Sequence, residues 1–304
     1  MGVRISSRTL IEEVLANLRF GHNRLAKFQE QLATGKSINR PSDDPTAVRR
    51  AMNLRTNIKN NDRFMENLSM AGRFVDATSS ALDVTVASVQ RLRELTVRAA
   101  NDTNSLTERE AIAAEVDEMI EGIIDLGNTT SGTRKLFSGT RTATTPFVAT
   151  WGLVGGKQRV TGLLPYAGNT DNISVKTGPG LSMTINQDAS NLYVNLINAS
   201  IGIRDDLLAD NSGSLQNVRI GQLDTQIDGI LDVLATVGAT GNRIDVLTQR
   251  YESLEVDMET YLSDTEDADF VEVMVELNQQ ENAYRAALDA SARVLQPSLL
   301  DFIR

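Results

Sequence analysis

The residues of this chain that could best hold a metal ion are the carboxylates of the acidic run Asp264–Asp269. Carboxylate oxygens are ligands that Ca²⁺ prefers in proteins. The run lacks the glycine and the twelve-residue ligand spacing of a calcium-binding loop. Acidic side chains also favour the N-terminal end of a helix, because the helix dipole is positive there. We therefore interpret the run as the entry to a helix and predict no metal site.

Other catalytic residue types are scarce. The chain has no cysteine and a single histidine, His22. Disulfides, thiolate zinc sites, cysteine nucleophiles and histidine-based triads are thereby excluded within one chain. The glycine pairs at 155–156 and 178–180 are not followed by the Lys and Ser/Thr of a phosphate-binding loop. The sequence predicts no catalytic residue and no cofactor, and we expect that the protein is not an enzyme.

The composition favours packed helices over an aromatic-lined pocket. The 304 residues carry a net charge of -10, and aromatic residues make up 5%. An acidic chain lacks the basic face typical of nucleic-acid binding proteins. No apolar stretch is long enough for a membrane span, and the first residues do not resemble a signal peptide. We expect neither nucleic-acid binding nor membrane insertion, and no export through a cleavable signal.

Proline and glycine divide the chain into helical flanks and a turn-rich middle. No proline lies between Pro45 and Pro146, or between Pro179 and Pro297, whereas the intervening stretch is rich in glycine. Such flanks permit long helices. Five helical segments are predicted, with a weak point in the fourth at Gly238–Gly241: 46–100, 105–126, 191–209, 215–262 and 267–295.

The first flank carries a heptad pattern. Its apolar positions alternate in steps of three and four, with one gap at a glycine: Ile11, Val14, Leu18, Gly21, Leu25, Phe28 and Leu32. This spacing is typical of a coiled-coil seam. An amphipathic helix packed on an ordinary core is the alternative interpretation.

Two segments have the residues of helix starts. In Arg40–Pro45, an Asp precedes a Pro, and in Ser105–Glu108 the Ser and Glu have the spacing of a capping box. The neighbouring Asp43 and Asp44 could be mistaken for metal ligands. Capping of free backbone N–H groups is the role we predict for them.

The middle of the chain changes to short alternating segments, at 159–163, 173–176 and 181–185, bounded by Gly, Pro, Asn and Asp. We predict a mainly α fold with a smaller β-rich inserted domain. A long antiparallel helical bundle is built from both chain ends, with terminal coiled-coil helices. The predicted divisions are terminal coiled-coil segments 1–40 and 267–304, a helical rod 41–136 and 213–266, and a β-rich domain 137–212.

Charge supports the pairing of the two ends. Residues 1–63 contain twelve basic and six acidic side chains, whereas residues 252–281 contain eleven acidic side chains and no basic one. Opposite charges give pairing specificity more than stability. Two independently solvated faces are the alternative.

Several motifs together resemble the flagellin superfamily. Gln31–Asn39 and the following Asp-Asp pair resemble the end of its first helix, and Val237–Ile244 resembles a turn of the family. Asp267–Phe270 with Leu277–Glu281, and Leu295–Leu300, resemble the start and end of its last helix. The resemblance covers both flanks, about 200 residues, and the motifs occur in the family's order.

Three features resemble the hook–filament junction proteins of that superfamily more than filament flagellins. Prolines flank Ser42–Asp44, where flagellins usually have alanines. Leu136–Thr142 followed by Pro146–Phe147 is similar to the junction proteins' entry into the β domain. Leu299–Phe302 resembles their Leu-Asp-Phe ending, although Ile303 and Arg304 extend it.

The resemblance implies a structural subunit of the bacterial flagellum that joins hook to filament through terminal helices that are disordered in the monomer. It implies copies of the chain in a ring, another hook-associated protein on the hook side and flagellin on the filament side. It also implies an export chaperone at the C-terminal helix and secretion by the flagellar type III route. The subunit-interface residues we predict are Ile11, Val14, Leu18, Leu25, Phe28, Leu32, Leu277, Tyr284, Leu288 and Leu295.

Two other functions remain open on the sequence. A short filament-forming flagellin would polymerise alone, which a junction protein should not do. A surface adhesin or carbohydrate-binding module would use the β-rich domain, with Trp151 and Tyr166 as its candidate residues.

Overall fold

The computed structural model describes residues 7–100 and 104–295, with side chains placed for all but a few at the two ends. The chain divides into two compact units. The terminal unit contains residues 1–61 and 253–304, and the central unit contains residues 62–252. Two long helices contribute to both units, α2 (Pro45–Ala99) and α6 (Ile220–Glu266).

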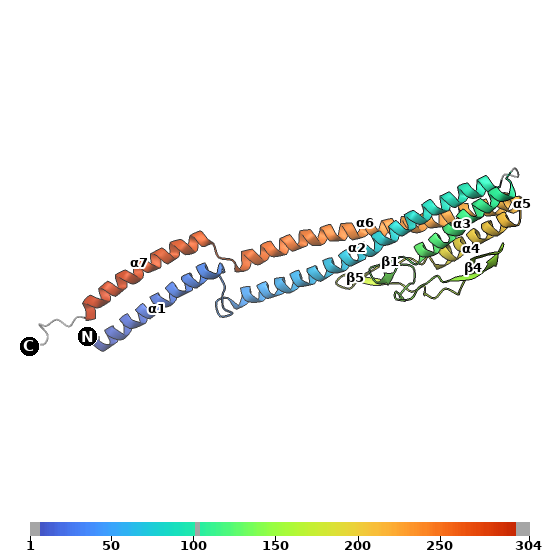
Figure 1. Cartoon of the computed structure of the whole chain (residues 1–304). Coiled ribbons are helices and arrows are strands. Elements are labelled where there is room, and N and C mark those ends of the chain that lie inside the picture. The colour runs from blue at the N-terminus through green and yellow to red at the C-terminus, as the bar shows by residue number, and fades with distance from the viewer. Residues whose placement is uncertain (1–6, 101–103, 296–304) are drawn as a thin grey trace, which may run out of the picture. The chain divides into compact units, whose positions relative to one another are not determined.

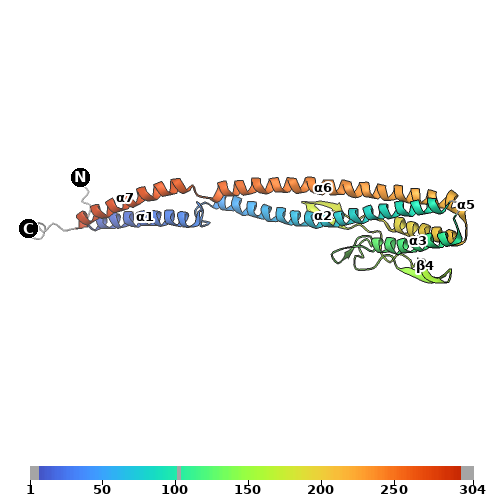
Figure 2. The ribbon, with the colours of Figure 1, turned by 45° about the horizontal axis from the view of Figure 1, so that its top comes forward.

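In the terminal unit, α1 (Ser7–Thr34) lies beside α7 (Phe270–Leu295), as Figures 1 and 2 both show. The two helices are antiparallel. Gly21, midway along α1, meets Tyr284 of α7, whereas Gly35, just after α1, accepts a hydrogen bond from the backbone N–H of Ala268 before α7 begins (2.9 Å). The two ends of the chain therefore share one helix pair, as the sequence predicted.

The start of α2 confirms the predicted cap. The carboxylate of Asp44 accepts hydrogen bonds from the backbone N–H groups of Thr46 and Ala47 (2.8 and 2.9 Å), and Pro45 is the first helical residue. These bonds lower the pKa of Asp44, since they favour its charged form. Asp43 accepts from the backbone N–H of Arg40 (2.9 Å). Both carboxylates hold the turn before α2, as expected.

The central unit is a helical bundle with a continuous apolar core. It combines the rest of α2 and α6 with α3 (Leu106–Gly127) and α4 (Ser190–Leu208). Helices α2 and α6 are antiparallel, because Phe64 stacks on Tyr251 while Arg93 pairs with Asp224 (2.6 Å). The capping box at Ser105 and Glu108 is present as predicted. A short helix, α5 (Ser212–Ser214), and a π-helical turn over Leu215–Arg219 lead into α6.

The β structure consists of three separate two-stranded antiparallel hairpins. Their strands are β1 (Thr130–Ser131) with β2 (Arg134–Lys135), β3 (Ala149–Val154) with β4 (Lys157–Leu163), and β5 (Ser174–Gly178) with β6 (Leu181–Thr184). The predicted segments at 159–163, 173–176 and 181–185 correspond to β4, β5 and β6. Strand β3, which contains Trp151, was not predicted.

An ion-pair network joins the β3–β4 hairpin to the bundle. The side chain of Arg204 on α4 is fully buried and donates to Asp117 of α3 (3.0 Å) and to the carbonyl of Val160 on β4 (2.9 Å). Arg159 approaches the same carboxylate (Nε to Oδ2, 3.2 Å). Asp117 thus pairs with both buried guanidinium groups, and Arg204 also pairs with Asp205 (2.8 Å), so this hairpin is fixed to α3 and α4.

Two expectations about α6 were wrong. The helix continues unbroken through Gly238 and Gly241, so the segment 237–244 is not a turn. The cost of about 1 kcal/mol for each helical glycine is offset by packing, since the neighbouring Val237 and Ile244 are buried. The helix also ends at Glu266, which leaves a shorter break before α7 than the sequence indicated.

Candidate assembly surface

The seam between α1 and α7 contains most of the predicted interface residues. Phe28 is buried, and five others are half-buried: Val14, Leu18, Leu25, Leu32 and Leu277. Their spacing of three and four residues keeps them on one face of each helix. The heptad pattern therefore faces a partner helix of the same chain.

The remaining predicted residues lie elsewhere on these helices. Tyr284 is half-buried opposite Gly21, whereas Ile11 and Leu288 are 38% and 43% exposed. Leu295 is the last residue of α7, and its side chain lies outside the described part. As contacts between subunits, all ten residues stay a prediction.

At Gly21, a gap in the heptad pattern, α1 contacts α7. A Cβ atom at this position would lie 3.1 Å from Cδ2 of Tyr284. The amide of Gln280 donates to the carbonyl of Gly21 (3.4 Å), and the ring of His22 meets the edge of Tyr284 at 6.2 Å. The absence of a side chain thus makes room for an aromatic ring. The lone histidine has a packing contact here.

In the terminal unit, a group of charged residues joins the segment that follows α1 to the segment between α6 and α7. The backbone N–H of Ser37 donates to the carbonyl of Glu266 (2.8 Å), next to the Ala268–Gly35 bond. These two hydrogen bonds form an isolated antiparallel bridge. The Glu266 carboxylate accepts hydrogen bonds from Lys36 Nζ and from Arg55 Nη2, the latter at 2.7 and 2.9 Å. We refer to Lys36, Arg55 and Glu266 as the clasp.

Electrostatics keep the clasp carboxylate ionised. Glu266 is 8% exposed, and burial alone would raise its pKa. The hydrogen bonds and charges of Lys36 and Arg55 outweigh that effect, so the pKa of Glu266 lies below its ordinary value of 4.5. Sequence reasoning did not find the clasp. It considered Glu266 only as part of an acidic run, and no local pattern links that run to Lys36.

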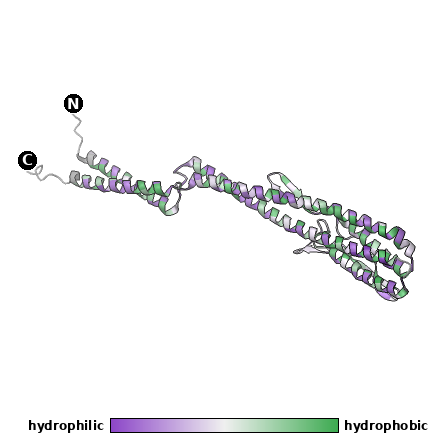
Figure 3. Ribbon diagram, turned by 90° about the horizontal axis from the view of Figure 1, so that it is seen from above, coloured by the Kyte–Doolittle hydropathy of each residue, from purple (hydrophilic) through white to green (hydrophobic). Residues whose placement is uncertain are grey.

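Many large apolar side chains of the terminal unit are exposed. Phe20, Phe270 and Val271 are 65%, 56% and 72% exposed. The others in this unit are Ile11, Leu15, Met52, Leu254, Val256, Tyr261, Met274, Val275 and Leu288. Polar and apolar residues interleave along these helices (Figure 3). A pair of helices with many exposed apolar side chains and few buried ones gains stability by packing against another molecule, which makes this unit the candidate assembly surface.

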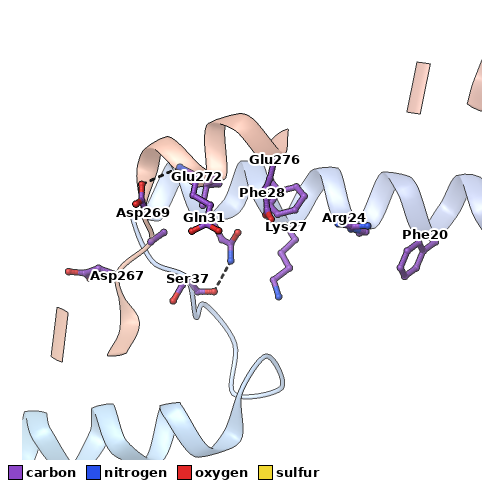
Figure 4. A pocket seen from close by; sticks show the side chains of 12 residues that line it. Phe20, Arg24, Lys27, Phe28, Gln31, Ser37, Asp267, Asp269, Glu272 and Glu276 are labelled. Atoms are coloured by element: carbon purple, nitrogen blue, oxygen red, sulfur yellow. Dashed lines mark hydrogen bonds between the residues drawn. The ribbon is translucent and has the colours of Figure 1, made fainter. Parts of the chain in front are cut away.

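A groove of about 700 Å³ runs between α1 and the start of α7. Figure 4 shows its lining, with Phe20, Arg24, Lys27 and Phe28 on the α1 wall and acidic residues, among them Glu272, at the α7 wall. The guanidinium of Arg24 lies 5.8 Å from the Phe28 ring centre. Neither Arg24 nor Lys27 pairs with the acidic wall among the described residues; Lys27 lies 3.9 Å from Asp43 instead.

The two residues considered for a carbohydrate site have different environments. Trp151 on β3 is 49% exposed. Tyr166 donates its hydroxyl to the carbonyl of Phe137 (2.8 Å), and its ring lies 5.5 Å from that of Phe147. Burial raises the pKa of Tyr166. Tyr166 therefore supports the local fold, and the adhesin alternative rests on Trp151 alone.

Within residues 7–100 and 104–295, no group of three or more His, Cys, Asp or Glu side chains could hold a metal ion. Over the same ranges, no helix is both long and apolar enough to span a bilayer.

Comparisons with known proteins match this architecture. Residues 5–142 match the bacterial flagellin N-terminal helical region. The chain is 24% identical to flagellar hook-associated protein 3 of Salmonella typhimurium, over 94% of this chain and 95% of that protein. It is 22% identical to a flagellin of Halalkalibacterium halodurans, over 95% of both chains. A solved structure of a putative flagellar hook-associated protein from Vibrio parahaemolyticus has a TM-score of 0.64 at 19% identity, covering 74% of this chain and all of that one.

A discontinuous helical bundle with a β-rich insertion and an exposed terminal helix pair defines a structural protein of the flagellin type. Residues 5–142 are a flagellin N-terminal helical region, and in sequence and fold the chain is like flagellar hook-associated protein 3.

Proposed function

We propose that this chain is the structural subunit that joins the hook of a bacterial flagellum to its filament. The observation that carries the proposal concerns the α1–α7 pair. Although these two helices pack against each other, they leave large apolar side chains such as Phe20 and Val271 exposed. A helix pair with so little buried surface needs further partners. Similarity over nearly the whole chain to hook-associated protein 3 supports the same role.

The proposal includes a division of labour. Residues 1–40 and 267–304 form the assembly core, 41–136 and 213–266 a helical rod, and 137–212 an outward-facing β-rich domain. Copies of the chain form a ring, with another hook-associated protein on the hook side and flagellin on the filament side. The chain leaves the cell by the flagellar export route without a cleavable signal, and a cytoplasmic chaperone binds its C-terminal helix. No catalytic role is assigned.

The test is deletion of the gene, followed by microscopy and by assay of flagellin in the medium. A junction protein predicts cells that keep their hooks and shed flagellin as monomer. Loss of flagellin itself from the medium would instead identify the chain as a filament subunit. Unchanged motility and filament attachment would contradict both.

A short filament-forming flagellin is the second candidate, favoured by the full-length similarity to the flagellin of H. halodurans. Purified chain distinguishes the two, because a flagellin polymerises alone into long filaments when seeded. We expect no such filaments from this chain.

A further inference from the structure

Charge in the terminal unit is separated between the two halves of the chain. Residues 7–61 carry ten basic and five acidic side chains, whereas residues 253–281 carry ten acidic side chains and no basic one. The sequence alone suggested that these opposite charges hold the two halves together. The structure shows how few of them do so.

Only the clasp joins the two charge sets by ion pairs among the described residues, through Glu266 with Lys36 and Arg55. Seven of the other acidic side chains are exposed, namely Asp257, Glu259, Asp264, Asp267, Asp269, Glu272 and Glu276. Eight of the ten basic ones are exposed as well. Most of the separated charge is therefore available to another molecule.

The helix arrangement turns this separation into two edges. In Figures 1 and 2, α1 lies beside α7, and α2 lies beside α6, so residues 7–61 follow one side of the unit and residues 253–281 the other. Each helix buries one face toward its neighbour. Ala51 of α2 and Glu266 of α6 are buried residues of this kind. We call the exposed side of α1 and of α2 up to residue 61 the basic edge, and that of residues 253–281, in α6 and α7, the acidic edge.

Both edges also carry apolar side chains among their charges. On the basic edge, Met52 is 60% exposed and lies between Arg49 and Lys59 in the sequence. On the acidic edge, Tyr261 is 61% exposed and lies between Asp257 and Asp264. Apolar residues surrounded by charged ones are the usual composition of a protein–protein interface, and Met and Tyr are enriched there. Both edges thus combine exposed apolar and charged side chains, and their charges have opposite signs.

We propose that the basic edge of one copy docks against the acidic edge of the next copy. This inference rests on the proposed function, in which copies form a ring. A two-fold dimer through either edge would oppose like charges, which is unfavourable. An edge-to-edge contact between different faces is heterologous, and such contacts close into rings or continue as helices. The occupant of each edge is therefore a second copy of this chain.

Charge reversal on separate chains tests the docking. One variant carries Arg49→Glu and Lys59→Glu, and the other carries Asp257→Lys and Asp264→Lys. Each alone, in cells lacking the wild-type gene, opposes like charges between copies, and we expect attached filaments per cell to fall at least tenfold. Co-expression of both variants lets the copies alternate, and we expect attachment to return to at least half of the wild-type level.

Co-expression distinguishes contacts between copies from contacts within a copy. Each chain in the mixture keeps its own reversed charges, so only contacts between copies can be restored. Absence of rescue would overturn the proposal. The control variant is Glu118→Lys with Glu121→Lys, two exposed residues of α3 in the central unit. Cells with this variant should carry as many attached filaments as the wild type. A tenfold loss of attached filaments would show that charge reversal reduces attachment wherever it is placed on the chain.

Cross-linking provides a readout that does not depend on filament attachment. Because the chain has no cysteine, Lys59→Cys on one chain and Asp257→Cys on another can be joined only between copies. We expect a product of twice the chain mass from co-expressed chains in the assembled state. Lys59→Cys paired with Arg49→Cys, both on the basic edge, should give none.

The outcomes separate this inference from the proposed function. Cross-linked dimers in cells whose filaments do not need the gene would contradict the junction role and keep the docking. A strict need for the gene, without rescue or cross-links, would keep the junction role and overturn the docking. Cross-links from Lys59→Cys to a different flagellar protein would overturn the choice of a second copy as the occupant.

Discussion

The two units use apolar residues in opposite ways. In the central unit a continuous cluster of buried side chains joins α2, α3, α4, α6 and the hairpins. In the terminal unit, among the described residues, the buried apolar side chains are only Phe28, Ala51 and Val273. A bundle of four helices can enclose a core, whereas two helices leave most of their surface in water. The central unit therefore has a packed core of its own, whereas the terminal unit leaves large apolar side chains exposed.

The difference also appears in how each unit treats charge. The central unit compensates its buried arginines locally, as Asp117 does for Arg204 and Arg159. The terminal unit leaves most of its charges exposed on two edges and uses only the clasp to join its halves. Local compensation serves folding, and exposed, separated charge serves recognition.

The largest effect expected is the loss of assembly after a seam substitution that leaves the central unit folded. Leu25→Asp places a charge on the half-buried face of α1 that meets α7. We expect no attached filaments, and a thermal transition of the central unit within about 1 °C of the wild type. Circular dichroism and microscopy measure the two. Leu288→Asp, on the exposed face of α7, should act alike, and normal attachment in both variants would contradict the assembly role.

A cavity in the central core should destabilise the chain without a direct effect on assembly contacts. Leu92 is fully buried in α2, so Leu92→Ala should lower the free energy of unfolding by about 2–5 kcal/mol. Denaturant unfolding of the full chain measures this loss. Val84→Ala, at a side chain that is 52% exposed, is the matched control and should change it by less than about 0.5 kcal/mol. Equal effects of the two substitutions on the free energy of unfolding would contradict the burial of Leu92 in the core.

Alkaline pH should weaken the central unit first. Tyr193 is fully buried, and burial raises the pKa of its hydroxyl to about 12, although a hydrogen bond with Thr85 acts against this shift. The neutral form is favoured in the folded state. Its stabilisation is thus fully present below the unfolded pKa of 10.0 and is lost as pH rises toward 12.

Two pKa units correspond to about 2–3 kcal/mol, which pH-dependent denaturant unfolding can measure. Tyr193→Phe should remove that part of the pH dependence. A Phe variant that loses stability between pH 10 and 12 as steeply as the wild type would show that another group is responsible.

Local signals in the sequence were sufficient for much of this fold. The cap at Asp44 and the capping box at Ser105 depend on residues two or three positions apart, and the structure has both. The heptad pattern of α1 also predicted a partner helix. Gly238 and Gly241 were misleading, because α6 continues there through the burial of Val237 and Ile244, which depends on other helices and is not visible in a single segment.

Contacts between distant segments were out of reach for the same reason. Glu266 meets Lys36 across 230 positions, and no pattern in either segment specifies the pairing. Charge asymmetry did indicate that the two chain ends belong together. Between these charge sets, the described part of the structure has one carboxylate paired with two cations and leaves most of the other charges exposed.

The smallest effect expected concerns the clasp. Glu266→Gln removes the charge that pairs with Lys36 and Arg55, but the side chain of Arg55 is 55% exposed, so water screens part of the interaction. We expect a local destabilisation of about 1 kcal/mol. The measurement is hydrogen exchange at the backbone N–H groups of Ser37 and Ala268, which form the bridge beside the clasp; both should exchange about five times faster, while amides of α3 are unchanged.

Acid should have the same effect in the wild type. Because the folded pKa of Glu266 is lowered, its contribution is fully present above the ordinary value of 4.5 and is lost as pH falls through the folded pKa. In Glu266→Gln, the ratio of Ser37 exchange to that of an exposed amide should no longer depend on pH over this range. If wild type and variant respond to acid alike, the carboxylate does not hold the bridge, and the terminal unit relies on the α1–α7 seam alone.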